Sequence, residues 1–131
     1  MRYVLFVCTH NAGRSQMAQA FFNKYAPEDL RAESAGQEPA PGVWPEVVEV
    51  MREKDIDLAT AKPQRLTAEL AADAQWLVTM GCGDECPVVS GTRRDDWPLE
   101  DPKGKPRERV REIRDDIEAR VKRLISTNGW S

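Results

Sequence analysis

The stretch VLFVCTHNAGRSQMAQAFF, residues 4–22, sets a cysteine and an arginine at the two ends of a short polar loop. Residues 3–7 before the loop form a continuous apolar run of strand length. After it, apolar residues recur at helical spacing from Arg14 onward, namely Met17, Ala18, Phe21 and Tyr25. The stretch therefore predicts a buried strand, a loop and a helix. In α/β sheets, ligands bind where such loops lie, beyond the strand ends and at helix N-termini.

The loop itself, CTHNAGR, has the form Cys-x5-Arg, which suits the binding of an oxyanion. Its backbone N–H groups and those of the first helical turn attract an anion, and Arg14 can contact two oxygens at once. The same positive field favours the thiolate form of Cys8, which makes it a nucleophile. We expect the oxyanion-binding residues to be Thr9, His10, Asn11, Ala12, Gly13, Arg14 and Ser15.

Individual loop residues carry more specific expectations. Asn11 and Gly13 tolerate the left-handed backbone angles that an inward-bending loop can need. Ser15 can either hydrogen-bond the thiolate or cap the helix. His10, the only histidine, lies inside the loop, and we expect its side chain to face solvent without a catalytic role. The alternative for Cys8 is a buried, inert core residue, which its place between a strand end and a helix start disfavours.

The rest of the chain continues the alternation of strands and helices. Residues 30–36 and 75–81 are predicted strands, and a short helix is expected to begin near Arg65. Two further helices are marked by apolar stripes, Val43, Val47, Val50 and Met51 in one and Val110, Ile113, Ile117, Val121 and Leu124 in the other. This alternation indicates a parallel sheet covered on both faces. Without a repeat or a linker, residues 1–131 are expected to form a single α/β domain.

Composition and charge narrow the classes of function. With 131 residues, 40% of them hydrophobic, the chain can bury a substantial core. Its longest apolar run, residues 3–8, is too short to span a membrane, so we expect a cytoplasmic protein with no membrane partner. The net charge of −3 and the mixed charges of residues 103–123 argue against a nucleic-acid partner. Three cysteines, an odd number, favour reactive thiols or a metal site over a disulfide scaffold.

The segment VCTHNAGRSQMA, residues 7–18, resembles the active-site signature of the low-molecular-weight protein tyrosine phosphatase fold and, within it, of the arsenate reductases. The resemblance covers essentially the whole chain and implies a three-layer sandwich, with a four-stranded parallel sheet and helices on both faces. It also implies roles for single residues: nucleophile Cys8, oxyanion-binding Arg14, loop-shaping Asn11, thiolate-stabilising Ser15 and general acid Asp101. The phosphatases typically have a tyrosine after the aspartate–proline pair, whereas here Lys103 follows, so a phosphotyrosine-stacking residue is missing.

The remaining cysteines, Cys82 and Cys86, lie in TMGCGDECP, directly after the last predicted strand, and should emerge at the same sheet edge as Cys8. Hydrolysis of a phosphate ester needs one thiolate. Reduction of arsenate to arsenite needs two electrons, which thiols supply by ending as a disulfide. The resemblance to the triple-cysteine reductases therefore implies that all three cysteines are catalytic, although the spacing of these two is shorter than in several relatives.

The sequence offers ligands for two kinds of cation site, and we expect neither to bind a cation. The three cysteines with His10 could form a Cys3His zinc site, but Arg14 would repel the cation. Some relatives hold potassium beside the loop with carboxylates. Here Gln19 and the Lys62-Pro63-Gln64 stretch remove that negative charge, so we expect no metal and no potassium dependence.

The function expected from these features is the reduction of arsenate, without a cofactor, by a monomer that an external thiol regenerates. Three cysteines fit a thioredoxin-type donor, and a low-molecular-weight thiol such as glutathione or mycothiol remains open. Phosphate and sulfate should compete with arsenate. One alternative is a low-molecular-weight phosphatase, which leaves two thiols unexplained. Another is a non-catalytic oxyanion-binding or thiol-sensing module, which leaves Asp101 without a purpose.

Overall fold

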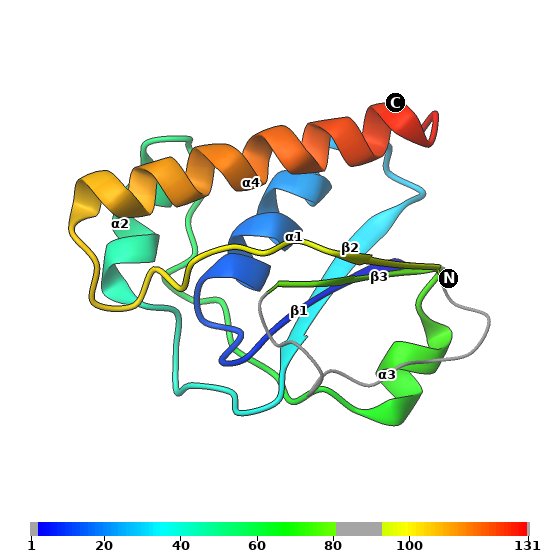
Figure 1. The fold of residues 1–131 in the computed structure, drawn as a ribbon, viewed down its shortest axis with the longest axis horizontal. Helices are drawn as coiled ribbons and strands as arrows, with labels where there is room; N and C mark the ends of the chain where they lie inside the picture. The colour runs from blue at the N-terminus through cyan, green and yellow to red at the C-terminus, as the bar shows by residue number, and fades with distance from the viewer. Residues whose placement is uncertain (1–2, 81–92, 131) are drawn as a thin grey trace.

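The computed structural model describes residues 3–80 and 93–130, which contain a four-stranded sheet in the order β2-β1-β3-β4 (Figure 1). The strands are β1 (Tyr3–Cys8), β2 (Arg31–Gly36), β3 (Trp76–Thr79) and β4 (Arg93–Asp96). Every neighbouring pair is parallel, so the C-terminal ends of all the strands lie at one edge. The predicted parallel sheet is confirmed, and Cys8 lies at that edge.

Helices cover both faces of the sheet, which completes the predicted three layers (Figure 1). The helices are α1 (Arg14–Tyr25), α2 (Pro45–Arg52), α3 (Ala68–Asp73) and α4 (Arg107–Thr127). In Figure 1, α1, α2 and α4 lie on one side of the sheet and α3 on the other. Because side chains alternate along a strand, β1 contributes Val4 and Phe6 to the larger core under α1, and Leu5 and Val7 to the smaller core under α3.

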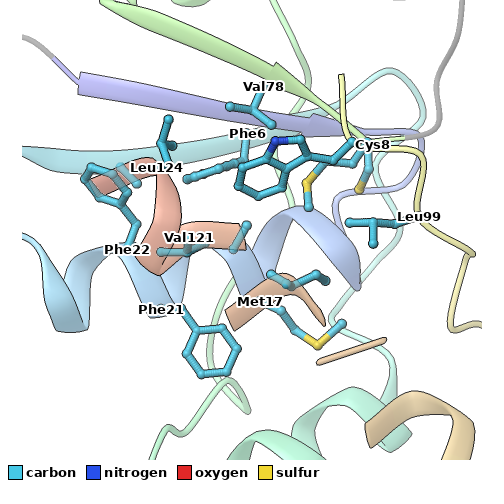
Figure 2. Close-up of a cluster of buried hydrophobic side chains, with 14 of the residues drawn as sticks. Phe6, Cys8, Met17, Phe21, Phe22, Val78, Leu99, Val121 and Leu124 are labelled. Atoms are coloured by element: carbon cyan, nitrogen blue, oxygen red, sulfur yellow. The ribbon is translucent and has the colours of Figure 1, made fainter. Parts of the chain in front are cut away.

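The larger core extends to the edge of the sheet where Cys8 lies. Figure 2 shows Phe6, Phe22, Val121 and Leu124 inside this cluster, with Cys8 and Leu99 toward one end of it. The rings of Phe6 and Phe22 meet edge to face at a centroid distance of 6.0 Å. Close packing of this kind leaves little freedom to the strand end. The backbone that carries Cys8 is therefore held by the core.

Helix α4 confirms the predicted apolar stripe. Its buried apolar residues include the five predicted ones, Val110, Ile113, Ile117, Val121 and Leu124. The opposite face carries charged residues that pair with one another or with α2, as Arg111 does with Glu53. Of the helices in the described part of the chain, none, including this 21-residue one, has an apolar stretch that could cross a membrane.

The structure differs most from the sequence expectations at a helix start, in α3, and at a strand, β4. The short helix expected from Arg65 begins at Ala68, because Thr67 caps it by accepting a hydrogen bond from Leu70 N at 3.1 Å. Arg65 instead pairs with Gly36 in a parallel bridge. The sequence pattern also does not predict β4, whose residues RRDD lack apolar alternation. This strand lies at the edge of the sheet, where charged side chains are typical.

Candidate active site

The loop between β1 and α1 turns its carbonyl groups outward. The carbonyls of Thr9, His10 and Ala12 accept hydrogen bonds from the backbone N–H groups of Glu38 (2.9 Å), Ala40 (3.0 Å) and Trp44 (3.0 Å). The C=O and N–H of one trans peptide point in opposite directions, so the N–H groups that follow these carbonyls face the other side. Within the described residues, the amides of residues 9–13 make no hydrogen bond. The loop therefore presents backbone donors, as expected of an anion cradle.

A buried hydrogen-bond chain connects this loop to the thiol. The Asn11 side-chain carbonyl accepts a hydrogen bond from Gln64 N at 2.9 Å, and because a backbone N–H can only donate, this assigns the amide orientation. The Asn11 NH2 group then donates to Ser15 Oγ at 2.7 Å. The Ser15 hydroxyl proton remains available for Cys8 Sγ, 2.8 Å away, and a Cys8 thiolate, which can only accept, takes it. Of the two roles predicted for Ser15, it takes the contact with the sulfur, since the helix cap at Gly13 makes no side-chain hydrogen bond.

Backbone angles confirm one expectation for the loop and contradict another. Asn11 has a φ of 50°, the left-handed conformation predicted for it, and is fully buried. Gly13 has a φ of −143°, so the same prediction was wrong for this glycine. Its role is steric, because a Cβ here would lie 2.8 Å from Pro102 Cγ and 3.3 Å from Trp44 Cδ1. Only glycine allows these two residues to pack against the loop.

A second glycine, Gly36, supports the loop and was missed in the sequence. It ends β2 in register with Cys8, and a Cβ here would lie 2.7 Å from the Thr9 carbonyl oxygen and 2.8 Å from Asn11 N. These contacts are with backbone, which cannot move aside as a flexible side chain would. A glycine at the end of the strand that neighbours the nucleophile was the available signal. Gln64, by contrast, gives no such signal, because its contact with Asn11 joins distant parts of the chain.

Arg14 and Asp101 lie together at the same site, as predicted. Arg14 is 6% exposed and donates to the Leu99 carbonyl at 3.0 Å, while its other terminal nitrogen lies 3.8 Å from an Asp101 carboxylate oxygen. These are its only polar side-chain contacts within the described residues. A guanidinium has five N–H donors, so donors remain for an oxyanion. Asp101 is partly exposed and accepts a hydrogen bond from Lys103 N at 3.0 Å, which orients its carboxylate.

The His10 side chain is half-buried, so it faces solvent in part and also contacts its neighbours. Its ring nitrogen Nδ1 lies 3.1 Å from the Glu38 carbonyl oxygen, which can only accept, so Nδ1 carries a proton. The ring also meets Trp44 edge to face at a centroid distance of 5.9 Å. The side chain of His10 therefore belongs to the wall of the site, while its backbone belongs to the loop.

The predicted positions of Cys82 and Cys86 lie outside the described residues and stay predictions. The described chain reaches Met80, whose N–H donates to the Val7 carbonyl at 2.8 Å, one residue before Cys8. Residues 3–80 and 93–130 contain no group of three or more histidine, cysteine, aspartate or glutamate side chains that could hold a metal. At the place weighed for potassium, the Ser34 hydroxyl donates to the side-chain oxygen of Gln19. The lack of potassium dependence also stays a prediction.

Known proteins similar to this chain establish its family. A family model described as low molecular weight phosphotyrosine protein phosphatase matches residues 3–128. The chain belongs to this family. Membership in the low molecular weight phosphatase family confirms the resemblance found in residues 7–18 and the fold it implied.

Several similar members of the family are named as arsenate reductases. A putative arsenate reductase of Halobacterium salinarum is 40% identical over 121 residues, which cover 88% of this chain and 85% of that protein. A thioredoxin-dependent arsenate reductase of Corynebacterium glutamicum superposes with a TM-score of 0.84 at 36% identity. The match covers 97% of this chain and 61% of that chain. An arsenate reductase solved in a phosphate-binding state has the same TM-score at 32% identity and covers 97% and 98% of the two chains.

Proposed function

We propose that this protein is an arsenate reductase, which reduces arsenate to arsenite with its own thiols and is regenerated by an external thiol donor. The observation that carries the proposal is the loop, where Cys8 lies 2.8 Å from the Ser15 hydroxyl and Arg14 keeps donors for an oxyanion. Two relatives named as arsenate reductases, with the identities given above, support this choice within the family.

The first chemical step uses the groups that the structure describes. The Cys8 thiolate attacks arsenic(V), and Asp101 gives a proton to the departing oxygen, which leaves as water. Arg14 and the backbone donors of residues 9–13 hold the remaining oxygens and their negative charge. The product of this step is a covalent bond between the Cys8 sulfur and arsenic, still in the +5 state.

The electrons then come from a second thiol. The Cys82 thiolate attacks the Cys8 sulfur, the sulfur–arsenic bond breaks, and its electron pair stays on arsenic, which leaves as arsenite. A Cys8–Cys82 disulfide remains. Cys86 then attacks Cys82, which restores the Cys8 thiol and leaves a Cys82–Cys86 disulfide for the donor to reduce. Cys8 acts first because only in the anion loop can a thiolate meet arsenate. Cys82 acts second because it is nearer than Cys86, along the sequence, to the end of the predicted strand.

One assay separates this function from its alternatives. Purified protein is given arsenate with thioredoxin, thioredoxin reductase and NADPH, and separately an aryl phosphate. A reductase consumes NADPH only when arsenate is present. A phosphatase, for which Cys8, Arg14 and Asp101 would suffice, cleaves the ester without arsenate-dependent oxidation, and that result would replace our proposal. A binding module does neither.

The order of the thiols is tested with single cysteine variants. Cys86→Ser should complete about one turnover and accumulate a Cys8–Cys82 disulfide, because the last exchange is blocked. Cys82→Ser is the matched control, since it should stop before arsenite leaves by the internal route. Mass spectrometry of peptides after arsenate treatment identifies the bonds, and a Cys86→Ser protein without a Cys8–Cys82 bond contradicts the order.

The same proposal extends to the partners, the oligomeric state and the cellular location of the protein. We propose a thioredoxin-type dithiol as donor, with phosphate and sulfate as competing oxyanions, and a single-domain monomer working in the cytoplasm. Thiols that must be regenerated need a reducing compartment, which supports this location. Reconstitution with thioredoxin, glutathione and mycothiol systems in turn identifies the donor, and sedimentation analysis tests the monomer.

A further inference from the structure

An aromatic side chain, Trp44, is fixed against the oxyanion loop. Its backbone N–H donates to the Ala12 carbonyl at 3.0 Å, and its Cδ1 atom would lie 3.3 Å from a Cβ placed on Gly13. The His10 ring meets the indole edge to face at 5.9 Å between centroids. Three loop residues therefore hold this indole, so it forms part of the wall of the site.

A cation, Lys103, lies on the face of that indole. Its Nζ is 5.1 Å from the centroid of the Trp44 ring, within the range of a cation–π contact. Two contacts hold the backbone at Lys103. Its N–H donates to the Asp101 carboxylate at 3.0 Å, and the preceding Pro102 packs against Gly13. The segment that carries the general acid therefore also places an ammonium at the wall of the site.

Among the described residues, no carboxylate lies within salt-bridge distance of the Lys103 ammonium. Nearby cations of α4 do form salt bridges, among them Arg107 with Glu49 and Arg109 with Glu100. Because an unpaired cation beside the loop adds to the field of Arg14, it attracts an anion that enters there.

We propose that Lys103, held on Trp44, determines the specificity of the oxyanion site. Its charge attracts a small free oxyanion, and its position on the indole denies that face to the aromatic group of an aryl phosphate. The inference rests on the proposed function, since such discrimination serves an enzyme whose substrate is a free oxyanion. Lys103 acts beside the reacting atoms and is a specificity-determining residue, with no part in bond making.

The test compares two ligands that differ only in an aromatic group, inorganic phosphate and phenyl phosphate. Their Kd values are measured by isothermal titration calorimetry on Cys8→Ser protein, so that neither ligand reacts. Three variants are made in that background, Lys103→Met, Lys103→Arg and Lys105→Met. Lys105 is the matched control, because it is an exposed lysine of the same loop whose N–H bonds to Pro102 and whose removal costs the same charge.

Lys103→Met should weaken phosphate binding by roughly three- to tenfold at low salt, and by less at high salt, where the charge is screened. Phenyl phosphate should lose less affinity or gain some, because its ring can then stack on Trp44. The ratio of the two Kd values should therefore move by roughly threefold or more. Lys103→Arg should preserve the ratio, because a guanidinium keeps the charge and also stacks on an indole.

An unchanged ratio in Lys103→Met, or an equal change in Lys105→Met, would overturn the proposal. Thermal melting of each variant shows whether a loss of binding is a loss of fold. The NADPH assay on the wild type tests arsenate reduction separately. A shifted ratio in a protein without arsenate-dependent oxidation contradicts the proposed function alone, and an unshifted ratio in an active reductase contradicts this inference alone.

Discussion

Arg14 and Arg114 are equally buried, each 6% exposed, but their surroundings differ. Arg114 on α4 donates to the Val50 carbonyl at 2.9 Å and to the carboxylates of Glu53 and Asp115 at 2.7 and 2.9 Å. Burial lowers the pKa of Arg114, but hydrogen bonds with Asp115 and Glu53 outweigh it, so this pKa lies above its ordinary value. The cation is compensated inside the protein and joins α4 to α2.

The charge of Arg14 is equally buried, but among the described residues it has fewer hydrogen-bond and carboxylate partners than that of Arg114. It has one carbonyl partner, Leu99 at 3.0 Å, and a long ion pair with Asp101 at 3.8 Å. Desolvating a cation costs free energy unless hydrogen bonds and opposite charge replace the water. The difference between the two arginines shows which one is structural and which one is left able to bind an anion. Four variants test this comparison.

The largest effect is expected when lysine replaces Arg14, because this change keeps the positive charge but removes the planar guanidinium. Arg14→Lys should reduce arsenate turnover and phosphate affinity by about a hundredfold or more, because an ammonium cannot contact two oxyanion oxygens in a fixed plane. Its thermal midpoint should stay close to that of the wild type. Steady-state kinetics and calorimetry measure the change, and near-normal turnover would show that charge alone suffices at this position.

Arg114→Met should lower the stability of the protein instead of its affinity for an oxyanion. Removing this cation leaves the buried Val50 carbonyl without its donor and Glu53 with one arginine fewer, so the free energy of unfolding should fall by about 2 kcal/mol. Phosphate affinity should not change. Urea denaturation measures the loss, with Arg120→Met as control, because Arg120 forms an i,i+4 pair with Asp116 on the same helix at greater exposure. Equal losses in both variants would contradict the structural role.

Within the loop, Ser15→Ala should have a smaller effect than the arginine change. Loss of the hydroxyl that points at Cys8 should slow the reaction of this thiol with iodoacetamide at neutral pH by about tenfold. The rate is measured with Cys82 and Cys86 replaced by serine, so that a single thiol reacts. Ser126→Ala, an exposed serine of α4, serves as control. An unchanged rate would mean that the hydroxyl does not stabilise the thiolate.

The smallest effect is expected on the stability of the protein when Glu53, a carboxylate partner of Arg114, is replaced. Hydrogen bonds from Arg111 and then Arg114 lower the pKa of Glu53 from 4.5 to about 2. A carboxylate with a lowered pKa stabilises the fold fully above its unfolded value, and this contribution is lost as the pH falls from about 4.5 toward 2. Glu53→Gln should therefore be less stable than the wild type at pH 7, and the difference should shrink over that acidic range.

Urea midpoints measured from neutral to acidic pH follow this difference. Glu28→Gln is the control, because Glu28 is exposed and forms no salt bridge within the described residues. A difference between Glu53→Gln and the wild type that stays constant with pH would contradict the coupling to the arginines.

The residues that the sequence predicted well are those that act within a short stretch of chain. Cys8, Arg14 and Ser15 lie within eight positions of one another, so a strand end followed by a helix start is enough to bring them together. Apolar periodicity likewise predicted α1, α4 and the central strands. It could not locate β4, because an edge strand of charged residues has no apolar pattern.

The contacts that the sequence did not reveal join residues far apart in the chain. Gly36 contacts the loop from the end of β2, and Gln64 contacts it from the segment between α2 and α3. Trp44 and Lys103 meet beside the loop from opposite halves of the chain. Spacing within one stretch carries no information about such meetings. They depend on how the helices and strands pack, and so they became visible only in the folded chain.

By itself the sequence determined an alternating α/β chain and a cysteine–arginine loop at the end of the first strand, because period and spacing act locally. It did not show how the buried charge of Arg14 or Arg114 is compensated, since both are helical residues with the same side chain. The tertiary structure decided that compensation: it brings Glu53 to Arg114, whereas among the described residues it brings only the Leu99 carbonyl and the more distant Asp101 carboxylate to the Arg14 side chain. Compensation of a buried charge depends on groups from other parts of the chain, which only folding brings within hydrogen-bonding distance.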